Sequence, residues 1–251
     1  MRVVNNGRVA KVTLDRPEVK NCLRIEDYRA VAEAFNSLSS ESSIHCVVLT
    51  GSGDSFCSGG DLGQIRASVR EGAFQDVSER FARAAIDAFS AIEKCSKIVI
   101  SAVDGYCQAG GLSLALCSDI VIATDRSTFR VPEGLVGLAD TFVASRLAPR
   151  VGMTKAKWLI LLADQFDARE ALAWGLINEI CGETDLAARV DSIAERLATI
   201  APNSLTEYKR AMNGTLPPFD VNVMLRAQES PFAVEGITAF IEKRKPSWIS
   251  T

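Results

Sequence analysis

The chain has 251 residues, of which 47% are hydrophobic and 24% are charged, and its formal net charge is −3. This composition is ordinary for a soluble protein, and the weakly acidic balance gives no electrostatic reason to expect a nucleic acid or an anionic membrane as partner. No stretch approaches the ~20 consecutive apolar residues of a membrane span, and the N-terminus lacks the apolar core of a secretory signal. We therefore expect a cytoplasmic protein with a small-molecule ligand.

The first 50 residues predict a hairpin, a helix and a strand. Two apolar runs flank Asn5-Asn6-Gly7, and Asn-Gly supplies the positive φ angles of a type I′ turn. From residue 25 to residue 38, apolar side chains recur every three or four positions, which predicts an amphipathic helix. Residues 44–50 then form a predicted strand.

Two glycine-rich segments, residues 56–61 and 106–113, are the most informative feature of the chain. Each follows a β-branched apolar run, residues 44–50 in one case and 97–103 in the other, and each leads into a helical stretch. Both are typical of strand-to-helix turns with exposed backbone N–H groups. Two such turns in contact would form an oxyanion hole, where paired donors stabilise negative charge on a carbonyl oxygen.

The rest of the chain predicts a mixed α/β core followed by helices. Residues 119–124 and 175–181 read as strands, and residues 186–200 show a helical stripe. After Pro202 only helical signals remain. We therefore expect an α/β core over residues 1–200 and a helical region over residues 201–251, which packs on its own core or on a neighbouring subunit.

The cysteines and the single histidine point to no catalytic or metal site. The seven cysteines form no CxxC pair and several lie in apolar runs, which favours reduced thiols in the core. The only histidine, His45, lies in a predicted strand, so a packing role is favoured. A Ser-His-Asp hydrolase and a histidine-ligated metal site are both poorly supported, and we expect no metal.

Phosphate binding is the usual alternative for glycine-rich turns. Neither segment has the GxxxxGK[ST] spacing of a P-loop, and the glycines of the second segment do not form GxGxxG. A purely structural tight turn stays open. The oxyanion hole remains the favoured interpretation.

Four ordered segments resemble the signatures of the crotonase (enoyl-CoA hydratase/isomerase) superfamily. They are residues 47–62, 102–123, 129–137 and 235–246, so the resemblance extends over nearly the whole chain. It implies an α/β fold, a crotonase-like spiral of ββα units with a C-terminal α-helical trimerisation region. It also implies a homotrimer or homohexamer.

The resemblance assigns roles to particular residues. It places the two oxyanion N–H donors on Ser58 and Gly110 and makes Glu133 the acid/base. The substrate would be an acyl-CoA thioester, with no separate cofactor. The positions implied for CoA binding are Lys20, Arg24, Gly59, Gly60, Asp61, Ile65, Phe240 and Lys243.

Ser113 is a departure from the hydratase pattern, which has a second glutamate at this position to activate water. A hydroxyl is a poor base at neutral pH. One carboxylate can still move a proton from Cα to Cγ, so double-bond isomerisation of an enoyl-CoA is the first expectation and hydration the second. A hydroxycinnamoyl-CoA-type hydratase-lyase, an acyl-CoA hydrolase and a catalytically silent acyl-CoA-binding protein are the alternatives.

Asp140 has two interpretations. Its segment resembles the region where dienoyl-CoA isomerases place a second carboxylate. Aspartate is also a favoured N-cap, and a helix is expected to run from here toward Arg150. Both interpretations stay open at this point.

Overall fold

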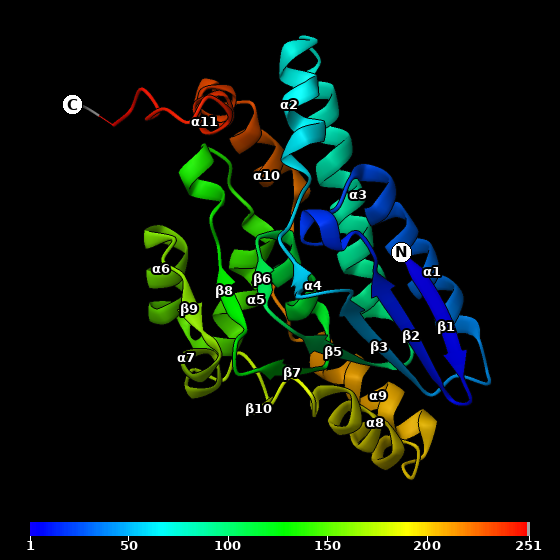
Figure 1. Ribbon diagram of the computed structural model, residues 1–251. Helices are drawn as coiled ribbons and strands as arrows, with labels where there is room; N and C mark the ends of the chain where they lie inside the picture. The colour runs from blue at the N-terminus through cyan, green and yellow to red at the C-terminus, as the bar shows by residue number, and fades with distance from the viewer. Residues whose placement is uncertain (250–251) are drawn as a thin grey trace.

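Two sheets of mostly parallel strands form the centre of the computed structural model, which describes residues 1–249 (Figure 1). The larger sheet has its strands in the order β1 (Arg2–Asn6), β2 (Val9–Leu14), β3 (Cys46–Gly51), β5 (Ile98–Val103), β7 (Ile120–Thr124) and β10 (Glu179–Cys181). The smaller has the order β4 (Ser55–Cys57), β6 (Tyr106–Gln108), β8 (Thr128–Arg130) and β9 (Phe166–Asp167). Among the strands of residues 1–249, only the pairs β1–β2 and β8–β9 are antiparallel.

The chain advances through both sheets together. Each of the long strands β3, β5 and β7 is followed by a short strand, β4, β6 or β8, that takes the corresponding place in the smaller sheet. Helices then return the chain to the larger sheet. This repetition is the predicted spiral of ββα units, and the predicted α/β class is confirmed.

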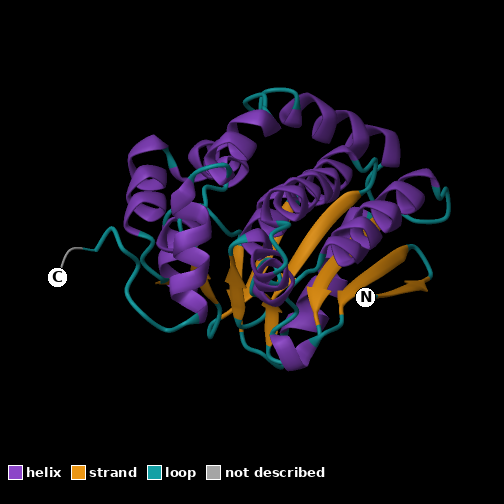
Figure 2. Cartoon of the chain, turned by 90° about the horizontal axis from the view of Figure 1, so that it is seen from above, coloured by secondary structure: helices purple, strands orange, loops and turns teal. Residues whose placement is uncertain are grey.

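Eleven α-helices and two 3-10 helices surround the sheets in the described chain (Figure 2). The helices of the core region are α1 (Ile25–Ser40), α2 (Leu62–Arg70), α3 (Phe74–Lys94), α4 (Gly110–Cys117), α5 (Thr141–Val151), α6 (Met153–Leu162), α7 (Ala168–Ala173) and α8 (Leu186–Leu197). The later ones are α9 (Pro202–Asn213), α10 (Val221–Gln228) and α11 (Pro231–Ile241), and the 3-10 helices are η1 (Pro17–Val19) and η2 (Glu133–Val136). No helix within residues 1–249 is long and apolar enough to cross a membrane.

The core lies where α1 and α3 pack against each other and against the sheets. The apolar face predicted for the first helix is buried, with Tyr28 and Phe35 of α1 among the largest fully buried side chains. Phe89 of α3 stacks on Phe142 of α5 with 4.7 Å between ring centroids. The periodicity of α1 was therefore a reliable guide to its buried face.

Three local predictions are corrected. In the hairpin, Asn6 pairs with Val9 and only Gly7 has a positive φ, so the loop is Gly7-Arg8 with the pattern of a type II′ turn, not type I′. The strand expected over residues 175–181 is confined to β10, because Gly175 has a φ of +75° and continues the turn after α7. His45 lies immediately before β3 instead of within a strand.

The glycine segments are more than turns, because each begins with a strand. Their first residues form β4 and β6, which pair with each other in parallel. Strands of three residues are too short to show an alternation of apolar and polar side chains. Their pairing therefore appears only in the folded chain.

The helices after residue 200 contact the same chain. Helix α10 packs on α3, and α11 packs on α2 and η2. The side chain of Lys209 in α9 is 4% exposed and forms an ion pair with Asp119 at 2.8 Å. The boundary at residue 200 and the trimer or hexamer stay predictions.

We predict that Lys209→Met lowers the free energy of unfolding by about 3–5 kcal/mol, because it leaves the buried Asp119 carboxylate without its cation. The matched control is Arg210→Met, whose ion pair with Glu207 is solvent-exposed and contributes at most about 1 kcal/mol. Urea denaturation of the two variants measures the difference. Equal losses would show that the buried pair does not attach α9.

Candidate active site

The two glycine turns touch each other. A Cβ atom on Gly59 would lie 2.4 Å from the Cβ of Ala109, and a Cβ on Gly111 would lie 2.3 Å from the carbonyl oxygen of Cys57. Gly59 has a φ of +99°, which side chains disfavour. Ala109 has a φ of +51° immediately before α4 and adopts this angle despite its side chain. The convergence expected from the sequence is therefore present, and glycine is required on both sides of it.

The bridge between Leu23 and Gly60 orients the first turn. The N–H of Leu23 donates to the carbonyl of Gly59, and the N–H of Asp61 donates to the carbonyl of Leu23, each at 2.8 Å. Backbone groups alternate in direction along an extended segment, so the N–H of Gly60 points away from Leu23.

Two backbone N–H groups are free at the turns. Gly60 and Gly110 both line the large cavity beside the turns. Within residues 1–249, neither N–H donates to a protein acceptor, and Gly110 is in the first turn of α4, where helical N–H groups lack intrahelical partners. Both N–H groups are therefore available to a ligand in the cavity.

The expectation for Ser58 is corrected. Its N–H donates to the carbonyl of Lys20 at 3.0 Å, so it is not free to bind a ligand, although Ser58 does line the cavity. Gly60 takes its place as the first donor. Sequence reasoning missed this, because the direction of each N–H depends on the pairing with Leu23.

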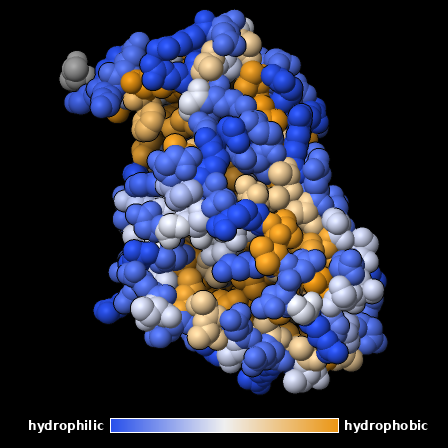
Figure 3. All heavy atoms as spheres, turned by 45° about the vertical axis from the view of Figure 1, so that its right-hand side comes forward, coloured by the Kyte–Doolittle hydropathy of each residue, from blue (hydrophilic) through white to orange (hydrophobic). Residues whose placement is uncertain are grey.

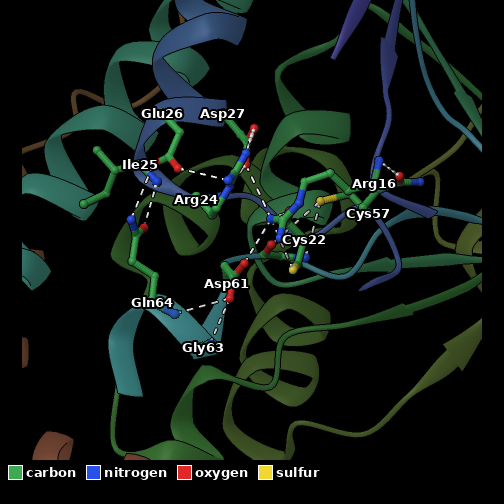
Figure 4. Close-up of polar contacts among 12 residues, drawn as sticks. Arg16, Cys22, Arg24, Ile25, Glu26, Asp27, Cys57, Asp61, Gly63 and Gln64 are labelled. Atoms are coloured by element: carbon green, nitrogen blue, oxygen red, sulfur yellow. Dashed lines mark hydrogen bonds and ion pairs between the residues drawn. The ribbon is translucent and has the colours of Figure 1, made fainter. Parts of the chain in front are cut away.

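Asp61 stabilises the first turn instead of facing the cavity. Figure 4 shows it between Arg16, Gly63 and Gln64. One carboxylate oxygen accepts the N–H groups of Gly63 and Gln64 and so caps α2, and the other accepts from Arg16 at 2.9 Å. Burial raises the pKa of Asp61, but these hydrogen bonds outweigh burial and hold the pKa below its usual value. Its expected contact with CoA stays a prediction.

The other residues assigned to CoA fall into two groups, those that line the cavity and those that do not. Gly60, Ile65 and Phe240 line the cavity, whereas Lys20, Arg24, Gly59 and Lys243 do not. The guanidinium of Arg24 contacts Asp27 at 2.8 Å and Glu26 at 3.2 Å, and the Lys20 ammonium lies 3.6 Å from the centre of the Tyr106 ring. Gly59 forms the turn contact described above, and Lys243 follows α11 with a φ of +54°. A role in CoA binding stays a prediction for all of them.

The cavity has a volume of about 390 Å³ and a mostly apolar wall. Side chains of α3 form one side of it, and these are Phe74, Ser78, Phe81, Ala82, Ala85 and Phe89. Phe240 of α11 is 58% exposed and lies at the wall. Figure 3 shows apolar side chains gathered near the C-terminal end of the chain, and a second apolar area lower on the same face.

Glu133 is the free carboxylate of the cavity. It begins η2 directly after Pro132, and its Oε2 atom is buried without a hydrogen-bond partner within residues 1–249. Burial, and secondarily the negative charge of Asp140, raise the pKa of Glu133 to about 8. A carboxyl group with this pKa can accept and release a proton near neutral pH.

Asp140 is both a cap and a cavity residue. Its Oδ1 accepts the N–H groups of Phe142 and Val143 at the start of α5, and its Oδ2 accepts from the Ser113 hydroxyl at 3.0 Å. Asp140 also lines the cavity, whereas Ser113 lies behind it and is fully buried. Burial raises the pKa of Asp140, and the three hydrogen bonds oppose that rise. The two interpretations of Asp140 therefore do not exclude each other.

Comparison with known proteins identifies similar sequences over nearly the full length. A family profile described as enoyl-CoA hydratase/isomerase matches residues 4–251. The chain is 31% identical to a short-chain-enoyl-CoA hydratase of Clostridium acetobutylicum, over 95% of this chain and 93% of the relative. It is 30% identical to a crotonyl-CoA hydratase of Syntrophomonas wolfei, over 97% and 95%.

Solved structures show the same fold. An enoyl-CoA hydratase from Mycobacterium avium subsp. paratuberculosis matches with a TM-score of 0.85 and 25% identity, covering 99% of this chain and 98% of that one. An enoyl-CoA hydratase/isomerase from Pseudoalteromonas atlantica matches with a TM-score of 0.83 and 32% identity, covering 98% of each.

We predict that Gly59→Ala destabilises the protein much more than Gly72→Ala. Both glycines have a positive φ, but a Cβ on Gly72 would meet nothing within 4 Å, whereas one on Gly59 would collide with Ala109. Gly72→Ala is expected to cost only the backbone strain, about 1–2 kcal/mol. Thermal unfolding of both variants measures the difference. Equal shifts in melting temperature would mean that the turns are not in tight contact.

Proposed function

The chain belongs to the enoyl-CoA hydratase/isomerase family, and from this premise we propose that it moves a proton on an enoyl-CoA thioester, with double-bond isomerisation as its reaction. The observation that supports this choice most directly is that the two cavity carboxylates differ in their hydrogen bonding. Glu133 has a free oxygen, and Asp140 has both oxygens hydrogen-bonded.

The free N–H groups of Gly60 and Gly110 would hold the thioester oxygen. When a base removes the α-proton, negative charge develops on this oxygen and an enolate forms. Each donor of such a pair contributes roughly 2.7–4 kcal/mol of transition-state stabilisation in other enzymes. Because the donors belong to the backbone, their position depends on the turn contact and on the bridge to Leu23.

Glu133 would transfer the proton. For a 3-enoyl-CoA, its carboxylate takes a proton from Cα, the electron pair of that C–H bond enters a dienolate, and the carboxylic acid returns the proton to Cγ. The double bond then lies between Cα and Cβ, and Glu133 is ionised again. Its pKa of about 8 suits both transfers.

Asp140 and Ser113 are poorly suited to a second proton transfer. Three hydrogen bonds to the Asp140 carboxylate favour its charged form, and the Ser113 hydroxyl donates to it. Hydration requires a second group that activates water, and no second carboxylate with a free oxygen lines the cavity within residues 1–249. This difference favours isomerisation.

Hydration of a 2-enoyl-CoA is the second candidate. Two of the relatives reported above are named as hydratases, at about 30% identity. The cavity also leaves Asp140 at its wall beside Glu133, where a water molecule could be oriented between the two. Isotope labelling separates the two reactions.

We predict that, in deuterated water, 3-enoyl-CoA is converted to 2-enoyl-CoA faster than 2-enoyl-CoA is hydrated, with deuterium at Cα or Cγ.

Glu133→Gln should lower turnover by about 10²- to 10⁴-fold while acyl-CoA binding persists. Glu195→Gln, at an exposed position on α8, is the control. Mass spectrometry and equilibrium binding provide the measurements. Unchanged turnover in Glu133→Gln would exclude Glu133, and tight binding without turnover of any enoyl-CoA would favour a silent binding protein.

We predict that kcat/KM rises with pH around a midpoint near 8, because Glu133 must be ionised to accept the α-proton. Asp140→Asn should move this midpoint to lower pH, since it removes a negative charge that raises the pKa of Glu133. Asparagine retains an oxygen that can cap α5. Initial rates from pH 5 to 10 measure the shift. A midpoint that stays in place, or moves upward, contradicts the assigned coupling.

A further inference from the structure

We propose that the hydroxyl of Tyr28 is a third hydrogen-bond donor to the thioester oxygen, beside the N–H groups of Gly60 and Gly110. The proposal rests on the proposed function, because it assumes that an acyl-CoA carbonyl occupies the cavity. It adds a side chain from α1 to a site otherwise formed by two backbone turns.

Tyr28 is buried among apolar residues and lines the cavity. The side chain is 2% exposed and has no hydrogen-bond partner for its hydroxyl within residues 1–249. Its ring is held edge-on by Phe81 and Phe89, with centroid distances of 5.5 Å and 5.9 Å. A phenol in the wall of a cavity can donate to a ligand bound there, and the two ring contacts leave this one little freedom to turn away.

The hydroxyl lies where the two turns meet. The position of a Cβ on Gly110 would be 2.1 Å from the Tyr28 oxygen, and 3.8 Å from the Cα of Gly59. The phenol therefore lies against the first residue of α4, whose N–H is one of the free donors. A ligand oxygen that accepts from Gly110 comes within reach of the phenol.

The surroundings keep the phenol protonated. Burial, followed by the nearby Cys57, Asp140 and Glu133, raises the pKa of Tyr28 well above its usual value. The hydroxyl is thus a donor throughout the pH range in which Glu133 titrates. A neutral donor gains strength as the carbonyl oxygen becomes negative, so it favours the enolate over the bound substrate.

The closing experiment compares Tyr28→Phe with Tyr208→Phe. Phenylalanine keeps the ring contacts of Tyr28 and removes only the hydroxyl, and Tyr208 lies on α9 with 68% of its surface exposed. We expect kcat to fall by about 10²- to 10³-fold in Tyr28→Phe, with a smaller change in KM, and no change in Tyr208→Phe.

A second readout does not require turnover. In the Glu133→Gln background, 2-butenoyl-CoA labelled with ¹³C at its carbonyl is bound, and the carbonyl stretching frequency is recorded by infrared difference spectroscopy. Donors that polarise the carbonyl lower this frequency. We expect a smaller lowering when Tyr28→Phe is added, because one of three donors is lost.

The position of the hydroxyl is checked by a double-mutant cycle on stability. Gly110→Ala alone should lower the melting temperature, because its Cβ collides with the Tyr28 oxygen. In the Tyr28→Phe background the nearest atom becomes the ring carbon at 3.4 Å, and the same substitution should cost much less.

An unchanged carbonyl frequency in Tyr28→Phe overturns the proposal, even if kcat falls, because the hydroxyl would then act elsewhere. Equal costs of Gly110→Ala in both backgrounds overturn the geometry. If Glu133→Gln retains full turnover while the frequency still depends on Tyr28, the reaction assigned to Glu133 fails and the third donor stands.

Discussion

The contact between the two glycine turns is the constraint on which the site depends. The pairing of β4 with β6 brings the turns together, and the absence of a side chain at Gly59 lets Ala109 approach. Backbone hydrogen bonds to Leu23 then fix the direction in which Gly60 presents its N–H. Ala109 keeps a positive φ at the same place, a strain of about 1–3 kcal/mol that the surrounding contacts maintain. The free donors are therefore positioned before any ligand binds.

The pKa of Glu133 also depends on the residue that caps α5, Asp140. Asp140 caps this helix through Oδ1, which accepts two backbone N–H groups, and these bonds stabilise its charged form. That charge lies in the same cavity as Glu133 and adds to the effect of burial on its pKa. The group that caps α5 thus also helps to raise the pKa of Glu133. The Ser113 hydroxyl strengthens the arrangement because it donates to the capping carboxylate.

The sequence predicted the elements and residues that depend on local spacing or motif. It did not predict those that depend on backbone pairing between distant segments. The apolar face of α1, the long strands and the position of Glu133 followed from spacing and motif. The short strands β4 and β6 have no such pattern, since their stability comes from each other. The choice between Ser58 and Gly60 could not be made from the motif, because both lie in the same turn and only the bridge to Leu23 shows which N–H is free. Tyr28 looked like an ordinary core residue, because its spacing on α1 reports burial but not what its hydroxyl meets.

The position of the second carboxylate explains why the family does not determine the reaction. In the hydratase pattern a carboxylate lies at the position of Ser113, on α4. Here α4 carries a hydroxyl, and the second carboxylate is Asp140, one element further along and bound to the start of α5. The cavity therefore still contains two acidic groups, so its electrostatic character is retained. Among the residues within 1–249 that line the cavity, only Glu133 has a carboxylate oxygen without a hydrogen-bond partner, because both oxygens of Asp140 accept hydrogen bonds. In the proposed reaction, the two turns would stabilise the enolate whichever way the proton moves, and the side chains around them would select its destination.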